Sequence, residues 1–263
     1  MSTNLVQYES HDSAVVLRMN RPERRNALNR ELVAMLTEAF TAVRYDGAAR
    51  CVILTGHGSV FCAGMDLAEL QEAVKKGADS GEVWDDAVRL GSLYELIYTL
   101  PKPTIAAVNG PAVAGGAGLA AVCDLAIAAP EAKIGYPEVR RGLVAAMVMP
   151  HLLRLVGERM ARYLLLTGVL IDASEALRSG LVNAVVAADR LLDYALAWAS
   201  AIAEGGPQAL TYTKELLERF SHQKASLEET ARASAAPRLG EECRQGLEAF
   251  FAKRPAPWAP GAK

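Results

Sequence analysis

The sequence predicts an α/β fold, because short apolar runs alternate with segments of helical periodicity along most of its 263 residues. Two loops rich in glycine and alanine support this prediction, since each follows an apolar run and leads into a helical pattern. The hydrophobic content of 51% is ample for a buried core and argues against disorder. The length suits one large domain or two small ones, and no change in composition marks a linker.

The N-terminal part is predicted to form a strand followed by a helix. Residues 13–19 make up the first apolar run. Asn29 can cap a helix whose apolar residues recur at helical spacing, and Gly47 is placed to end it. The apolar stripe of this helix comprises Leu32, Val33, Leu36, Phe40 and Val43.

The alternation continues through the middle of the chain. A helix expected at about 85–100 stops at Pro101, and the polar stretch 72–86 before it contains two glycines. This stretch is expected to be the most mobile internal segment because its hydrophobicity is low. Strands are expected at 51–55, 104–108, 124–129 and 133–135.

The pattern is mostly helical from His151 onward. Asp172 offers a helix cap, and Pro207 suits the first turn of a helix. Helices are expected at 150–156, 158–166, 173–178, 189–203, 207–220, 226–235 and 240–252, with a strand at 181–186 among them.

Charge and hydropathy exclude several classes of function. The 28 basic and 30 acidic residues nearly cancel and form no Lys/Arg-rich block, so nothing favours binding to nucleic acid or to an anionic membrane. The N-terminus lacks a signal segment, and no apolar run is long enough to cross a membrane. The four cysteines show no metal-ligand spacing, so we expect reduced thiols, no metal site and a cytoplasmic protein.

The two loops with small residues, the first at 59–67 and the second at 109–118, carry the main chemical signal. Small residues at a strand-to-helix turn let the backbone approach a ligand and leave the first helical amides free. Two such turns can aim two N–H groups at one developing oxyanion. Close packing of a helix on a sheet is the alternative, but it explains only the second loop well.

Taken together, these loops resemble the crotonase (enoyl-CoA hydratase/isomerase) superfamily. Residues 61–67 are similar to its F-x-A-G-x-D-L loop, and residues 107–116 to its A-V-N-G-x-A-x-G-G-G segment, with Ala114 replacing the first glycine of the triplet. The resemblance runs from about residue 12 to 257. Further matches lie, in order, at 21–28, 135–138, 165–168, 180–183 and 250–255.

The resemblance implies a crotonase-type spiral of β-β-α units followed by C-terminal helices that trimerise. Residues 1–195 would then form the α/β acyl-CoA-binding core, and residues 196–263 the helical part. It also implies an acyl-CoA substrate, with coenzyme A as part of the substrate rather than a separate cofactor. The expected assembly is a homotrimer or homohexamer.

The resemblance also implies three catalytic groups. The amides of Met65 and Gly115 would stabilise the enolate oxygen of a thioester. Glu138, in a Gly-Tyr-Pro-Glu motif, would face the α- and β-carbons of the substrate, and burial would raise its pKa toward neutrality. Alternatively, Glu138 is a solvated residue favoured by a helix dipole.

One position departs from the family pattern. Two-glutamate hydratases carry a second glutamate three residues after the oxyanion-hole glycine, where this chain has Gly118. The nearest other carboxylate, Asp124, is expected to be structural. Hydration with one carboxylate is feasible because water and proton add to the same face, and an isomerase also needs only one. Hydration, dehydration and double-bond isomerisation all stay open.

The coenzyme A contacts implied by the resemblance lie in three segments. The adenine and pantetheine would follow the backbone of the first loop. Arg24 and Arg25 would bind the phosphates, or else they are merely solvated. Lys253 would reach the coenzyme A of a neighbouring subunit. The implied residues are Arg24, Arg25, Ala27, Ala63, Asp66, Leu67 and Lys253.

Four residues are candidates for the acyl pocket: Tyr136, Arg140, Arg141 and His151. One arginine would pair with a distal substrate carboxylate, or else both arginines are solvated charges. Tyr136 and His151 would line the pocket, or else they pack in the core. The small apolar run 144–149 suggests a short or branched acyl group. A 3-methylglutaconyl-CoA-like substrate fits both features.

The sequence therefore predicts an enoyl-CoA hydratase-type lyase with a single catalytic glutamate. The alternatives are a Δ3-Δ2 enoyl-CoA isomerase and a catalytically inert acyl-CoA binder, although a retained Glu138 argues against the latter. RNA-binding members of the superfamily use a lysine-rich helix. The corresponding helix here, 31–46, has one arginine and no lysine, which argues against that function.

Overall fold

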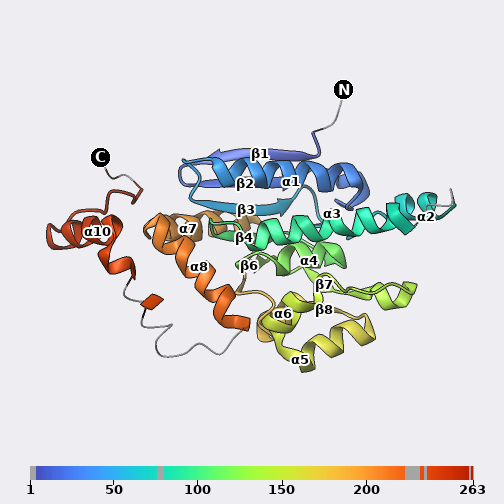
Figure 1. Ribbon diagram of the computed structural model, residues 1–263. Helices are drawn as coiled ribbons and strands as arrows, with labels where there is room; N and C mark the ends of the chain where they lie inside the picture. Colours follow the sequence, from blue (N-terminus) through green and yellow to red (C-terminus); the bar gives the residue numbers. More distant parts are fainter. Residues whose placement is uncertain (1–3, 76–79, 223–231, 234–235, 261, 263) are drawn as a thin grey trace.

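The computed structural model describes the chain except residues 1–3, 76–79, 223–231, 234–235, 261 and 263 (Figure 1). It contains a six-stranded sheet of order β1-β2-β3-β4-β6-β9 and a three-stranded sheet of order β5-β7-β8. Helices cover both sheets and continue to the C-terminal end (Figure 1). The expected α/β fold is confirmed.

The large sheet is parallel except for its first strand. β1 runs antiparallel to β2, and each later neighbour in the sheet is parallel. Its inner strands are continuous apolar runs because helices cover both of their faces. The strands are β1 (Val6–His11), β2 (Ala14–Met19), β3 (Cys51–Gly56), β4 (Thr104–Val108), β6 (Leu125–Ala128) and β9 (Ala184–Val185).

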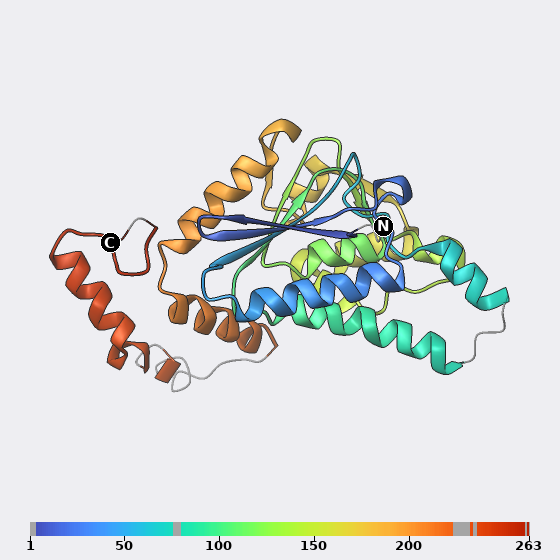
Figure 2. The same cartoon turned by 90° about the horizontal axis from the view of Figure 1, so that it is seen from above.

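Helices pack on the two faces of the large sheet (Figure 2). α1 (Arg30–Tyr45) and α3 (Ser80–Tyr98) lie together on one face, and α7 (Leu191–Ala203) lies on the other. The Asn29 side chain caps α1 by accepting from the Leu32 amide at 2.9 Å, as expected. The predicted boundary between 195 and 196 falls inside α7.

The small sheet positions the second loop. It consists of β5 (Ala112–Val113), β7 (Lys133–Gly135) and β8 (Leu170–Asp172). β5 leads directly into α4 (Gly115–Ala121), and β7 leads into the 3-10 helix η2 (Pro137–Arg141). The sheet therefore holds the starts of two short helices close to each other.

The remaining elements differ from the predictions in one place. Residues 72–86 are largely helical, because α2 (Leu67–Lys75) runs into this stretch and α3 begins at Ser80; residues 76–79 lie outside the described residues. The helices expected at 150–156 and 158–166 are confirmed as the two arms of α5 (Met149–Thr167), which are separated by the non-helical Gly157 with φ 70° and ψ 166°. The helix expected at 226–235 falls mostly outside the described residues.

Among the described residues, four helices lie beyond β8, and three 3-10 helices occur besides η2. No helix within the described ranges is both long and apolar enough to traverse a bilayer. The helices are α6 (Ala173–Arg178), α8 (Pro207–His222), α10 (Glu241–Phe251) and the already described α7, and the 3-10 helices are η1 (Pro22–Arg24), η3 (Ala188–Arg190) and η4 (Ala236–Leu239).

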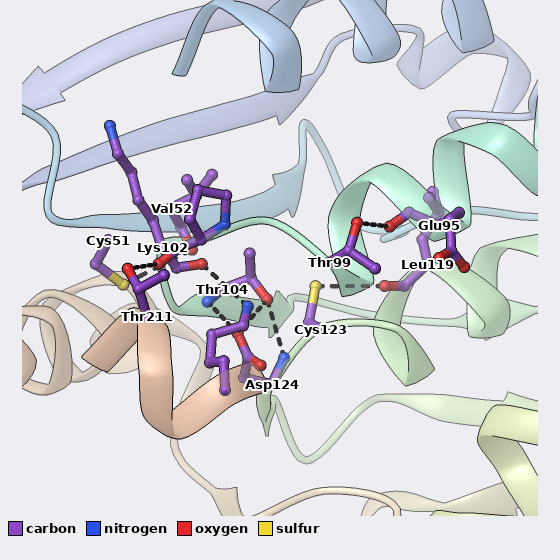
Figure 3. A network of polar contacts seen from close by, with 12 residues as sticks. Cys51, Val52, Glu95, Thr99, Lys102, Thr104, Leu119, Cys123, Asp124 and Thr211 are labelled. Carbon is purple, nitrogen blue, oxygen red and sulfur yellow. Dashed lines mark hydrogen bonds and ion pairs between the residues drawn. The ribbon is translucent and has the colours of Figure 1, made fainter. Parts of the chain in front are cut away.

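A polar network joins α8 to the starts of β4 and β6 (Figure 3). The Lys214 ammonium donates to the Asp124 carboxylate at 2.6 Å and to the Lys102 carbonyl at 3.1 Å. The same carboxylate oxygen accepts from the amide of Thr104 at 2.7 Å and from its hydroxyl at 2.9 Å. Asp124 is therefore a structural residue, at the end of β4 that is remote from the second loop.

Candidate active site

The two loops lie side by side at the carboxyl ends of β3 and β4. The Phe61 amide donates to the Pro111 carbonyl at 3.1 Å, and the Val113 amide donates to the Cys62 carbonyl at 2.9 Å. The Ala114 amide then donates to the carbonyl of Gly135 at 2.8 Å. β5 thus connects the first loop on one side with the strand that precedes Glu138 on the other.

Glycines allow this close approach. A Cβ atom at Gly110 would lie 2.0 Å from the Ser59 carbonyl oxygen, and one at Gly116 would lie 2.2 Å from that of Cys62. Both distances are too short for any side chain. Gly110 and Gly116 therefore serve close packing between the loops.

The amides of Met65 and Gly115 are free donors. Leu28 bonds to the residues on either side of Met65, through the Gly64 carbonyl and the Asp66 amide, so this pairing leaves the Met65 amide unused. Gly115 is the first residue of α4, where amides have no intrahelical acceptor. Neither amide donates a hydrogen bond to any part of the protein that the structure describes.

Ala114 has a backbone conformation that sets the direction of the following amide. Its φ of 54° and ψ of −125° favour glycine, the residue that the family motif has at this position. Such a conformation in an alanine costs roughly 1–3 kcal/mol and occurs mainly at functional sites. The amide of Gly115 follows directly after this strained residue.

A cavity of about 540 Å³ lies between the loops and η2. Ten of the predicted site residues contribute to its lining. These ten residues are Arg24, Arg25, Ala27, Ala63, Met65, Asp66, Leu67, Gly115, Glu138 and Arg141. The structure therefore brings together residues that are up to 117 positions apart, since Arg24 and Arg141 line the same space.

Glu138 is the carboxylate suited to proton transfer in this cavity. It follows Pro137 at the start of η2 and is half-buried, and its Oε2 atom has no hydrogen-bond partner among the described residues. Burial raises the pKa of Glu138, and the positive charge of Arg141 partly opposes this effect. A carboxyl group whose pKa is raised in this way is better suited to both taking up and releasing a proton than a solvated one.

Asp66 lines the same cavity but is held in the ionised form. Burial alone would raise its pKa, yet the Arg21 guanidinium at 2.6 Å and the amides of Ala68 and Glu69 outweigh burial, so the pKa of Asp66 lies below its usual value. The hydrogen bonds from the amides of Ala68 and Glu69 to the Asp66 carboxylate also cap α2. Asp66 therefore fixes the end of the first loop.

Four predicted site residues lie outside the cavity lining. Tyr136 is fully buried, with its hydroxyl unpartnered among the described residues. Arg140 donates to the Thr167 carbonyl at 3.2 and 3.3 Å, and the His151 ring packs edge-on against Tyr98. Lys253 follows α10, which both views place at the opposite end of the molecule from α2 (Figures 1 and 2).

Sequence reasoning missed three residues that build the site. Arg21 binds Asp66, and the side chain of the fully buried Asn26 donates to carbonyls of the first loop, including that of Val60 at 2.8 Å. Both lie within segment 21–28, and the resemblance of this segment to the family was the feature that could have identified them. Tyr94 reaches the cavity from α3, and nothing in the sequence connects that helix with the loops.

No set of three potential metal ligands occurs in the part of the chain that the structure describes.

Comparisons with known proteins place this chain among the enoyl-CoA hydratases and isomerases. The family described as enoyl-CoA hydratase/isomerase matches residues 9–261. A Thermus thermophilus protein, whose name provisionally assigns it to the enoyl-CoA hydratases, is 45% identical over 95% of this chain and 99% of that protein. The crotonyl-CoA hydratase of Syntrophomonas wolfei is 38% identical over 94% and 95%. The crystal structure of an enoyl-CoA hydratase from Bacillus anthracis has a TM-score of 0.89 at 31% identity and covers 98% and 99%.

Proposed function

Because the chain belongs to the enoyl-CoA hydratase/isomerase family and has the crotonase fold, we propose that it is a hydro-lyase that reversibly adds water to 2-enoyl-CoA. The same reaction in reverse dehydrates a 3-hydroxyacyl-CoA. The observation that carries this proposal is the convergence of two free amides and one half-buried carboxylate on a single cavity.

Each group has one task in the proposed reaction. The amides of Met65 and Gly115 bind the thioester oxygen and stabilise its negative charge in the enolate. Glu138 accepts a proton from water while the water oxygen bonds to C3 and the C2–C3 π electrons move toward the thioester. Glu138 then returns the proton to C2, so the carboxylate is regenerated and hydrogen and hydroxyl arrive on one face.

Double-bond isomerisation is the second candidate. It is favoured by the single carboxylate, because moving a proton between C2 and C4 needs only one acid–base group. Assaying a panel of acyl-CoA thioesters separates the candidates. Loss of absorbance at the enoyl thioester band indicates hydration, and appearance of that band from a 3-enoyl-CoA indicates isomerisation. No change despite tight binding of coenzyme A indicates an inert binder.

Coenzyme A would enter past the N-terminal segment and the first loop. Arg24 and Arg25 are exposed at the cavity and suit the phosphates. The backbone of the first loop from Ala63 to Leu67 would hold the pantetheine. Lys253 does not line the cavity of its own chain and follows α10, which lies at the opposite end of the molecule from α2 (Figure 1), and this supports the proposal that it serves a neighbouring subunit.

The acyl chain would occupy the part of the cavity beyond Glu138. Small or apolar residues contribute to the lining together with Arg141. We propose a short or branched acyl group with a distal carboxylate, of the 3-methylglutaconyl-CoA type. The wall residues are Leu143, Val144, Ala145, Met147 and Val148.

Arg141→Met should lower kcat/KM for a carboxylated enoyl-CoA roughly ten- to a hundredfold, with a much smaller effect on crotonyl-CoA. The reason is that a charge-assisted hydrogen bond contributes about 1.5–3 kcal/mol. Arg140→Met is the matched control, because Arg140 bonds to the Thr167 carbonyl outside the cavity. Equal losses on both substrates would contradict the role of Arg141.

We expect a homotrimer or homohexamer in solution. Large apolar side chains stay exposed on several C-terminal elements, among them Leu166 at 70% and Leu217 at 67%. An interface between subunits would remove these side chains from water. Analytical ultracentrifugation should show a multiple of three, and a stable monomer at micromolar concentration would contradict this expectation.

A cytoplasmic location is proposed because Cys51, Cys62, Cys123 and Cys243 are all unpaired.

A further inference from the structure

The space next to Gly118 is occupied by a tyrosine. A Cβ atom built on Gly118 would meet Tyr94 at three points: the hydroxyl oxygen at 2.4 Å, Cζ at 2.7 Å and Cε2 at 3.2 Å. The three nearest atoms thus belong to one side chain. The position from which two-glutamate hydratases project their second carboxylate is therefore filled, in this chain, from a different helix.

Tyr94 is also bonded to the oxyanion-hole segment. Its hydroxyl donates to the Gly115 carbonyl at 2.7 Å and lies 3.2 Å from the point where a Gly115 Cβ would be. Only 3% of the residue is exposed, yet it lines the cavity together with Leu90, one turn earlier on α3. The hydroxyl therefore has a fixed position beside Gly115, in a side chain that lines the same cavity as Glu138.

The hydroxyl can accept a hydrogen bond but cannot act as a base. Its proton is already engaged by the Gly115 carbonyl, so a lone pair is left for another partner. Burial, followed by the neighbouring acidic groups that include Glu138, raises the pKa of Tyr94 well above 10. The side chain therefore stays neutral across the pH range in which the protein would work.

We propose that Tyr94 is a catalytic residue of the hydration, whose hydroxyl oxygen accepts a hydrogen bond from the water that adds to C3. This inference rests on the proposed hydratase function and specifies its water site. The water gives one hydrogen bond to Tyr94 and its other proton to Glu138, and its oxygen forms the bond to C3. The π pair becomes the enolate held by the amides of Met65 and Gly115, and Glu138 protonates C2. Tyr94 ends the cycle unchanged, because only Glu138 moves protons.

Replacing Tyr94 by Phe separates water binding from proton transfer. The first readout is the hydration of crotonyl-CoA, which should slow roughly ten- to a hundredfold when one buried hydrogen bond is lost. The second readout is exchange of the C2 hydrogens of butyryl-CoA with D2O, which needs Glu138 and the amides but adds no water. This exchange should change little in Tyr94→Phe.

Tyr98→Phe is the matched control, since Tyr98 lies one turn further along α3 and packs against His151. It should leave both rates unchanged. Equal losses of both rates in Tyr94→Phe would show that Tyr94 acts through Gly115, and no loss would show mere packing; either result overturns the proposal. A wild-type protein that fails to hydrate any enoyl-CoA would instead refute the proposed function.

A second experiment transplants the missing carboxylate. Gly118→Glu alone should abolish hydration, because the new side chain collides with Tyr94. Tyr94→Ala alone should lose the water site. The double variant Tyr94→Ala/Gly118→Glu should hydrate crotonyl-CoA faster than either single variant, since the removed ring leaves space for the carboxylate. Tyr98→Ala/Gly118→Glu should show no such recovery. A double variant no faster than the faster of the two single variants would overturn the inference that Tyr94 and the carboxylate introduced by Gly118→Glu share one position.

Discussion

Glu138→Gln should reduce the turnover of enoyl-CoA hydration by roughly 10² to 10⁴, the range for a positioned acid–base group. The change keeps size and polarity but removes the group that takes a proton from water and returns it to C2. The affinity for coenzyme A should barely change, because the proposed contacts lie in the first loop and the N-terminal segment. Steady-state kinetics and calorimetric titration with coenzyme A measure the two quantities.

The pH profile provides a second readout for the same variant. Only the ionised carboxylate accepts the proton of water, and burial raises the pKa of Glu138 above 4.5. The wild-type rate should therefore fall on the acidic side with an apparent pKa above 4.5, and this limb should be absent in Glu138→Gln.

The control is Glu131→Gln, which changes an exposed glutamate and should have no effect. Retention of more than about a tenth of the wild-type turnover in Glu138→Gln would assign the proton to another group. Asp66 and His151 are the first alternatives. Asp66 is engaged by Arg21, and His151 lies outside the cavity lining, so neither offers a ready replacement.

Gly116→Ala should cause the second large loss, in both stability and turnover. Its Cβ would lie 2.2 Å from the Cys62 carbonyl oxygen and 2.7 Å from the Cys62 Cβ. The first loop and α4 would have to separate, which costs roughly 1–3 kcal/mol of folding free energy. Separation also moves the Met65 and Gly115 amides apart, and loss of one such donor lowers turnover roughly 10²- to 10³-fold.

Gly47→Ala is the matched control for this glycine substitution. Gly47 is exposed just after α1, has no heavy atom within 4 Å of the added Cβ, and has no positive φ. It should leave denaturant unfolding and hydration unchanged. If Gly116→Ala behaved like Gly47→Ala, the close approach of the two loops would not be needed to form the amide pair.

The sequence predicted the buried strands better than the exposed ones. β3 and β4 are continuous apolar runs, and both were located to within one residue. β1 was missed because its residues Val6–His11 are mixed in polarity and mostly accessible. The break expected between the helices 150–156 and 158–166 is confirmed, because the φ of 70° and ψ of 166° at Gly157 are non-helical and separate the two arms of α5.

The sequence predicted the residues of the candidate site only where these residues lie in short motifs of neighbouring positions. Met65, Gly115 and Glu138 each lie in a recognisable motif, and the structure places all three at one cavity. Adjacent residues were not distinguishable: Arg141 lines the cavity, whereas Arg140, one position earlier in a 3-10 helix, bonds elsewhere. Tyr94 could not have been found, because only the tertiary packing of α3 on α4 brings it to Gly118.

Incubating the wild-type protein with crotonyl-CoA in D2O and observing the product by NMR tests the central claim most directly. A hydratase with one carboxylate should form 3-hydroxybutyryl-CoA that carries a single deuterium at C2, on the same face as the new hydroxyl. Migration of the double bond without a new hydroxyl, or a thioester recovered unchanged, would contradict the account.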